Sequence, residues 1–337
     1  MAQTSSKNIS NKNIIISDFA EKIKQGNIAQ LSRGITLIES IKISDKERAR
    51  QLMQLCLPHS GKSIRIGITG VPGVGKSTFI EAFGTYLTDI GKKVAVLAID
   101  PSSSIRKGSI LGDKTRMEKL AKNKNAFIRP SPSGDSLGGV ARKTKESILL
   151  CEAAGFDVIL IETVGVGQSE TLVHSMVDFF LLLKLAGSGD ELQGMKRGIM
   201  EMADAIVINK ADGDNIKNAQ WARNEFNRAL HLYPKKENNW TPKVTTCSAL
   251  NNEGIIKIWE IIEEFIRLTK SNSHFNRKRV VQNTNWLRES ITQQLQNNFY
   301  ENKNVKKELE IQIRKIESDE TTPFDAAQKL IGIYKSL

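Results

Sequence analysis

The fold is decided by Ile64-Arg65-Ile66-Gly67-Ile68-Thr69-Gly70-Val71-Pro72-Gly73-Val74-Gly75-Lys76-Ser77-Thr78. Its first six residues alternate apolar and other side chains, as a strand does. The next nine match G-x-x-x-x-G-K-[ST], whose glycines let backbone N–H groups wrap phosphates. Residues 78–87 can form the helix whose N-terminus faces that anion. We therefore expect all nine to bind a nucleoside triphosphate, with Lys76 neutralising the β- and γ-phosphates and Ser77 binding Mg²⁺.

Short apolar segments recur between helical patterns over roughly 200 residues after this stretch. Several are continuous apolar runs, which are typical of strands buried on both faces of a parallel sheet. Alternating strands and helices predict an α/β fold, a P-loop domain with a mostly parallel, doubly wound sheet. The expected strands are residues 64–69, 94–100, 126–130, 156–162, 179–183, 205–209 and 244–248.

Helical patterns flank this domain on both sides. Ser44-Asp45-Lys46-Glu47 matches a capping box, and Thr322-Pro323-Phe324-Asp325 combines a capping box with proline at the first helical position. Between them, Leu287, Ile291 and Leu295 recur every fourth residue. This apolar stripe needs either the α/β domain or a second subunit to cover it, and the pattern favours neither.

The chain has 337 residues, of which 39% are hydrophobic and 26% charged. These values exclude disordered and fibrous proteins. We divide the chain into a helical N-terminal extension (1–58), a P-loop domain (59–270) and a helical C-terminal arm (271–337).

The net charge of +12 is spread over all three segments. A nucleic-acid binder usually concentrates its charge, so we expect no nucleic-acid partner. The one local basic run, Arg277-Lys278-Arg279, is interpreted as a solvated linker.

The longest apolar run, residues 177–183, is interrupted by Asp178 and is too short to span a bilayer, and residues 1–13 lack a secretory or mitochondrial signal pattern. We therefore expect no membrane association and a cytoplasmic protein. Cys56, Cys151 and Cys247 lie far apart and are predicted to be buried thiols.

Asn209-Lys210-Ala211-Asp212 follows the apolar run 205–208, at the carboxyl end of a predicted strand. Ligands of open α/β sheets gather at that edge. The Asp212 carboxylate can accept hydrogen bonds from guanine N1–H and from its amino group, whereas adenine offers no matching pair of donors. Asn209 would tie this loop to the phosphate loop, and the Lys210 stem would cover the base.

A second element, Thr246-Cys247-Ser248-Ala249-Leu250, closes another predicted strand. It resembles the S-A-[KL] element, in which a backbone N–H contacts guanine O6. We therefore expect Ser248, Ala249 and Leu250 at the base and GTP as the nucleotide.

Two further strands end in carboxylates, Asp100 and Glu162. Beside a phosphate loop, such carboxylates can hold Mg²⁺ and orient the attacking water. Gly165 follows Glu162 by three residues, as in the D-x-x-G of Ras-like GTPases, where the glycine N–H contacts the γ-phosphate. Val166 stands where those enzymes carry a water-orienting glutamine, and Gln168 follows without an assigned role. We hypothesise slow intrinsic turnover that awaits a partner.

These motifs together resemble the GTPases associated with methylmalonyl-CoA mutase, the MeaB/ArgK family of SIMIBI-class P-loop proteins. The resemblance runs from about residue 20 into the C-terminal helices, and its last two stretches are particular to this family. The matching stretches are residues 33–39, 67–73, 100–103, 108–117, 162–170 and 187–198.

The resemblance implies a homodimer joined largely through the C-terminal arm, with an adenosylcobalamin-dependent acyl-CoA mutase as partner. GTP binding and hydrolysis would gate cofactor loading and protect the mutase, which in turn raises GTPase activity. The resemblance also implies that Asp100, Asp113 and Glu162 are the Mg²⁺ and switch carboxylates. Residues 187–196 resemble a third switch, with Lys196 engaging the nucleotide or the mutase.

Three other functions compete with this interpretation. A kinase or ATPase of basic amino-acid transport would need an ATP site, against which Asn209–Asp212 argues. A metal-insertion GTPase would store metal in His- or Cys-rich segments, which the sequence lacks. A non-hydrolysing scaffold predicts lesions at Lys76, Ser77 or Glu162, and all three residues are intact.

Overall fold

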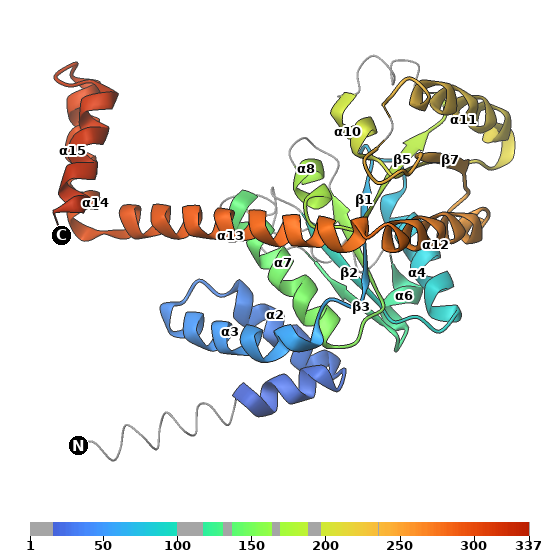
Figure 1. The fold of residues 1–337 in the computed structure, drawn as a ribbon, viewed down its shortest axis with the longest axis horizontal. Coiled ribbons are helices and arrows are strands. Elements are labelled where there is room, and N and C mark those ends of the chain that lie inside the picture. Colours follow the sequence, from blue (N-terminus) through green and yellow to red (C-terminus); the bar gives the residue numbers. More distant parts are fainter. Residues whose placement is uncertain are drawn as a thin grey trace. The chain divides into compact units, whose positions relative to one another are not determined.

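The computed structural model describes residues 16–99, 117–130, 137–163, 169–187, 197–234 and 236–336. Seven strands pair in parallel in the order β3-β2-β4-β1-β5-β6-β7 (Figure 1). All seven predicted strands are confirmed, with ends shifted by at most two residues. They are β1 (Ile64–Thr69), β2 (Val94–Ile99), β3 (Ala126–Arg129), β4 (Val158–Thr163), β5 (Phe179–Leu185), β6 (Ala205–Asn209) and β7 (Lys243–Thr246).

Helices cover both faces of this sheet, which confirms the doubly wound α/β fold (Figure 1). Side chains alternate along each strand, so Leu160 of β4 packs into the core under α4 and α12, whereas Ile161 faces α7 and α8. A third cluster lies between β6 and α11. The helices are α4 (Lys76–Asp89), α6 (Glu118–Lys122), α7 (Leu137–Ala153), α8 (Ser169–His174), α10 (Arg197–Met202), α11 (Ile216–Leu230) and α12 (Ile255–Ser271).

The N-terminal extension packs on α7. Residues 16–24 are helical and are followed by α2 (Ile28–Glu39) and α3 (Ile43–Cys56). Leu31, Ile35 and Ile38 fall on one face of α2 and are buried in the same core as α7.

The capping box predicted at Ser44 is wrong. Helix α3 begins at Ile43, so Ser44 is already its second residue, and the N-cap is Lys42 without a side-chain cap. The hydroxyl that reaches the first turn is that of Ser40, which donates to Asp45 Oδ2 at 2.7 Å. The acid of the pattern, Glu47, instead accepts hydrogen bonds from Arg50, one turn further along the helix.

The basic run predicted to be a solvated linker is instead fastened to the start of the sheet. Arg279 lies in α13 (His274–Glu301), and its Nε and Nη2 donate to the two carboxylate oxygens of Asp178 at 2.8 and 2.7 Å. Its remaining N–H groups donate to the carbonyls of Gly61 and Ser63, each at 2.6 Å. The linker interpretation is wrong because these acceptors come from segments distant in sequence.

Residues 281–337 form a separate compact unit that holds the rest of α13, α14 (Lys303–Glu317) and α15 (Pro323–Lys335). Val305, Ala326 and Leu330 are buried between α14 and α15. The helix predicted at Thr322 is confirmed, since Asp325 N–H donates to Thr322 Oγ1 at 3.1 Å and closes the cap.

Candidate functional site

The phosphate loop joins the end of β1 to the start of α4. Gly75 is the N-cap of α4 and has a φ of +93°, in the left-handed region that favours glycine. A Cβ on Gly70 would lie 2.6 Å from the carbonyl oxygen of Leu183, which would force the loop away from β5. The glycines are thus required both by backbone conformation and by close packing.

Lys76, the first residue of α4, is buried beneath this loop. Its Nζ donates to the carbonyls of Gly70 and Val71 at 2.8 and 3.3 Å. Burial lowers the pKa of Lys76, and the nearby carboxylates of Glu162 and Glu170 oppose that effect. The ammonium is therefore held at the point where phosphate oxygens can replace the two carbonyls.

Asn209, at the end of β6, connects three loops. Its Nδ2 donates to the carbonyl of Val74 in the phosphate loop at 2.8 Å. Its Oδ1 accepts from Ala249 N–H at 3.2 Å and from the Cys247 thiol at 3.3 Å. Both the nitrogen and the oxygen of this amide are hydrogen-bonded, and Asn209 is only 2% exposed. The Asn209 side chain therefore fixes the spacing between the loops.

The predicted guanine-binding residues also meet. Ser248 Oγ donates to a carboxylate oxygen of Asp212 and accepts from Asn251 N–H at 3.1 Å. This leaves the second Asp212 oxygen for other donors. Lys210 has a φ of +58° and is exposed, as is Leu250, so neither is needed for packing.

The described residues fit a Mg²⁺-bound phosphate. Ser77 is the second residue of α4, and Glu162 lies near the end of β4, close enough to affect the pKa of Lys76. Hydroxyl and carboxylate oxygens are the ligands that Mg²⁺ takes beside substrate phosphates. Four other predicted site residues lie outside the described residues: Asp100, Asp113, Gly165 and Lys196.

Comparisons with known proteins agree with this geometry. Residues 31–304 match the family described as methylmalonyl-CoA mutase-associated GTPase MeaB. A probable GTPase of Mycobacterium tuberculosis is 46% identical over 318 residues, which cover 94% of this chain and 95% of the relative. The chain belongs to the MeaB family.

Two further relatives support the assignment. The mitochondrial methylmalonic aciduria type A homolog of Mus musculus is 44% identical over 322 residues, covering 93% of this chain and 78% of the relative. A crystal structure of a LAO/AO transport system kinase superposes with a TM-score of 0.74 at 38% identity, over 95% of this chain and 97% of that one. This MeaB-family protein is a P-loop GTPase.

Two residues that contact or influence the predicted site residues received no such role from the sequence. Cys247 was predicted only to be a buried thiol, which is confirmed, yet it also donates to Asn209. Burial raises the pKa of Cys247 to about 12, with a further contribution from Asp212, so the thiol stays protonated as a donor. Glu170 received no role in the sequence analysis. Its three-residue spacing from the apolar Val173 places the two residues on one helix face, which the sequence alone could have indicated.

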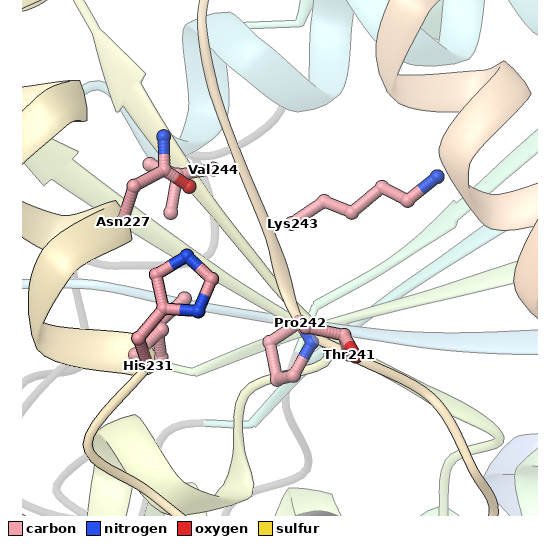
Figure 2. A pocket seen from close by; sticks show the side chains of 7 residues that line it. Asn227, His231, Thr241, Pro242, Lys243 and Val244 are labelled. Carbon is pink, nitrogen blue, oxygen red and sulfur yellow. The ribbon is translucent and has the colours of Figure 1, made fainter.

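A separate hollow of about 290 Å³ lies between the end of α11 and the start of β7 (Figure 2). His231 and Pro242 flank it, and Lys243 is the first residue of its strand. Ligands of parallel sheets bind at the carboxyl ends of strands, and this hollow is at the amino end of β7. It contains none of the predicted site residues.

No described helix is both long enough and apolar enough to cross a bilayer.

Proposed function

We propose that this MeaB-family GTPase is a Mg²⁺-dependent chaperone for an adenosylcobalamin-dependent acyl-CoA mutase. Its GTP cycle would gate cofactor loading and protect the mutase from inactivation. The observation that carries the proposal is the match of residues 31–304 to the mutase-associated family. We place the protein in the cytoplasm, and we expect neither a nucleic-acid nor a membrane partner.

In the proposed GTP complex, the base lies between the two loops joined by Asn209. The free Asp212 oxygen accepts from guanine, and Ser248 holds the carboxylate in orientation. The backbone of Ala249 and Leu250 faces O6, and the Lys210 stem covers the base. The support is geometric, because Asn209 fixes these elements to the phosphate loop.

At the other end of the nucleotide, Lys76 leaves the carbonyls of Gly70 and Val71 and binds the β- and γ-phosphates. Ser77 and Glu162 would hold Mg²⁺, together with Asp100 and Asp113. When bound, the ion neutralises charge that develops on the phosphates during hydrolysis. Gly165 would contact the γ-phosphate and Lys196 would engage the nucleotide or the client, as the family resemblance implies.

The proposed homodimer forms through the C-terminal arm. Leu287, Ile291 and Leu295 of α13 are 60%, 50% and 59% exposed in the single chain. They recur every fourth residue and make one apolar stripe. A unit with so few buried apolar residues of its own gains stability by covering that stripe, and the same stripe of a second copy fits it.

The dimer is tested by sedimentation at several protein concentrations. Leu287→Glu together with Leu295→Glu should give a monomer that still binds GDP, because neither residue belongs to the nucleotide site. Glu289→Gln, on the same helix, is the control and should leave the dimer intact. A dimer that survives the double substitution would place the interface elsewhere.

The chaperone activity is tested by measuring GTP and ATP hydrolysis, alone and with an adenosylcobalamin-dependent acyl-CoA mutase. We expect slow hydrolysis of GTP only, a severalfold increase with the mutase, and a steep fall in both rates in Lys76→Ala. Omission of Mg²⁺ should also abolish turnover. A rate that no such mutase changes would contradict the client, and equal use of ATP would favour the transport-kinase alternative.

A further inference from the structure

Glu170 is a buried carboxylate, and one of its two oxygens has no hydrogen-bonding partner among the described residues. It is 3% exposed, and its Oε2 has no donor within hydrogen-bonding distance there. Removing a carboxylate from water without donors costs several kcal/mol. The stability of the fold therefore does not explain why residue 170 is a glutamate. Its position relative to the nucleotide site offers an explanation.

The packing of α8 on β1 places Glu170 at the level of the phosphate loop. A Cβ on Gly67 of β1 would lie 2.7 Å from Val173 Cγ1, so α8 lies directly on this strand. Glu170 precedes Val173 by three residues and shares its helix face, one turn nearer the helix N-terminus. Because α8 follows β4, that N-terminus points to the carboxyl edge of the sheet, where β1 ends at Thr69.

The cation of the phosphate loop at this level of the sheet is Lys76. The ammonium of Lys76 bonds to the Gly70 carbonyl at 2.8 Å, one residue beyond the end of β1. Glu162 and Glu170 are the two carboxylates that act electrostatically on it. Glu162 is assigned to Mg²⁺ in the proposed GTP complex, which leaves Glu170 as the counter-ion of the lysine when the loop is filled.

We propose that Glu170 is a positioning residue for GTP hydrolysis, a buried counter-ion that orients the Lys76 ammonium toward the phosphates. The proposal rests on the phosphate-binding role of Lys76 given above. Two of the three Nζ donors bond to the Gly70 and Val71 carbonyls. Once GTP draws them away, the carboxylate of Glu170 fixes the direction of the side chain.

This role predicts that the loss of Glu170 affects nucleotide binding and the rate of hydrolysis differently. The negative charge of Glu170 also opposes the phosphates, so its removal leaves ground-state binding unchanged or tighter. The lysine then adopts several orientations, and stabilisation of the transition state falls. A carboxylate needed only for packing would have the opposite signature, because its loss would weaken nucleotide binding together with thermal stability.

The first test substitutes Glu170→Gln, which keeps size and removes charge. We expect kcat to fall about tenfold, as for loss of one oriented electrostatic contact, with the Kd for fluorescent GDP no higher than in the parent. Glu170→Asp should recover part of kcat. Glu146→Gln, a mostly buried glutamate of α7 outside the nucleotide site, is the matched control. A kcat within twofold of the parent, or a weaker Kd with a lower Tm, would overturn the proposal.

The second test asks whether Glu170 acts through Lys76. Single-turnover hydrolysis is measured for Lys76→Ala with and without Glu170→Gln. The tenfold effect of Glu170→Gln should shrink to less than twofold when the lysine is absent, because residues that act as a unit are not additive. A tenfold effect that persists would mean that Glu170 contacts water or metal directly, and the proposal would fail. If Lys76→Ala alone kept the parent rate, the proposed phosphate site itself would be wrong.

Discussion

Asn209 Nδ2 donates a hydrogen bond to the carbonyl of Val74 at 2.8 Å, which ties the end of β6 to the phosphate loop. The same side chain accepts from Ala249 N–H through its other amide atom. One buried amide therefore joins the predicted guanine-binding loop to the phosphate loop. In the proposed GTP complex, this amide sets the distance between the two loops.

Asn209→Ala should weaken GDP binding by about 10- to 100-fold, since buried groups on both loops lose their partners at about 1–3 kcal/mol. Titration of fluorescent GDP measures the effect. Asn227→Ala on α11, which lines the hollow at the other end of the sheet, is the control. A change below threefold in Asn209→Ala would mean that the loops hold their spacing without the amide.

A comparison of Gly75→Ala with Gly91→Ala distinguishes the effect of backbone strain from that of a steric clash in the phosphate loop. Gly75 has a φ of +93°, and a Cβ there would lie 2.8 Å from Asn209 Nδ2. Gly91 has a φ of +83° with nothing within 4 Å of such a Cβ. Both substitutions should lower the free energy of unfolding by about 1–2 kcal/mol, from the left-handed backbone.

The two glycine variants should differ in nucleotide binding. Gly91→Ala should bind GDP as the parent does, whereas Gly75→Ala should lose binding because the new methyl group displaces the Asn209 amide. Urea unfolding and GDP titration of the same samples measure the two effects. If both variants bound GDP equally, the new methyl group and the Asn209 amide would have moved apart without weakening nucleotide binding.

The residues that meet at the candidate nucleotide site could be grouped from the sequence because the constraints on each motif are local. Gly70–Thr78, Asn209–Asp212 and Ser248–Leu250 each fix backbone and chemistry within a few residues. The strands were found for the same reason, since β4 begins with four consecutive apolar residues and β5 with five.

What could not be predicted depends on contacts distant in sequence. Arg279 and Asp178 are 101 residues apart, and no periodicity relates them. The role proposed for Glu170 depends on α8 lying on Gly67, which only the fold reveals. The predicted capping box of α3 was wrong for a different reason. Two serines, Ser40 and Ser44, lie near the start of the helix, and the sequence pattern does not show which hydroxyl bonds to the first turn.

Asp212→Asn should exchange guanine for xanthine as the preferred base. The amide can donate to the xanthine C2 oxygen, whereas guanine offers a donor at that position. We expect the Kd for GDP to rise at least 100-fold and that for xanthosine diphosphate to fall. Such an exchange follows when a polar group is left unpaired by the wrong ligand.

Ser248→Ala keeps the carboxylate of Asp212 but removes the hydroxyl that holds it. The Kd for GDP should rise by about three- to tenfold, the loss of one hydrogen bond, with the preference for guanine intact. Competition between guanine, xanthine and adenine nucleotides measures both effects. A loss of base preference in Ser248→Ala would mean that the serine itself reads the base.

Arg279→Gln should destabilise the unit formed by residues 1–280. Asp178 is 2% exposed, so the substitution leaves a buried carboxylate without its ion-pair partner. Breaking one side of such a pair costs about 3–5 kcal/mol. The measurement is urea unfolding, and the control is the exposed Arg277→Gln, which should change the free energy by less than about 0.5 kcal/mol.

The stability should also decline in mild acid because of His174. Burial lowers the pKa of His174 from 6.5 to about 4, and Lys278 adds to the effect. Between those two values the unfolded chain binds a proton that the folded chain does not, so stability falls as the pH drops below 6.5. The contribution between pH 7.5 and pH 5 is about 1–2 kcal/mol after allowance for partial exposure.

His174→Gln removes this proton-binding difference. The change in unfolding free energy between pH 7.5 and pH 5 should therefore be smaller in His174→Gln than in the parent by that amount. His231→Gln, at an exposed histidine in the hollow beside β7, should leave the pH dependence unaltered. The measurement is urea unfolding of the parent and both variants at the two pH values. Parallel pH profiles for the parent and His174→Gln would show that His174 is protonated in the folded protein, and that the ring can reach solvent past Lys278.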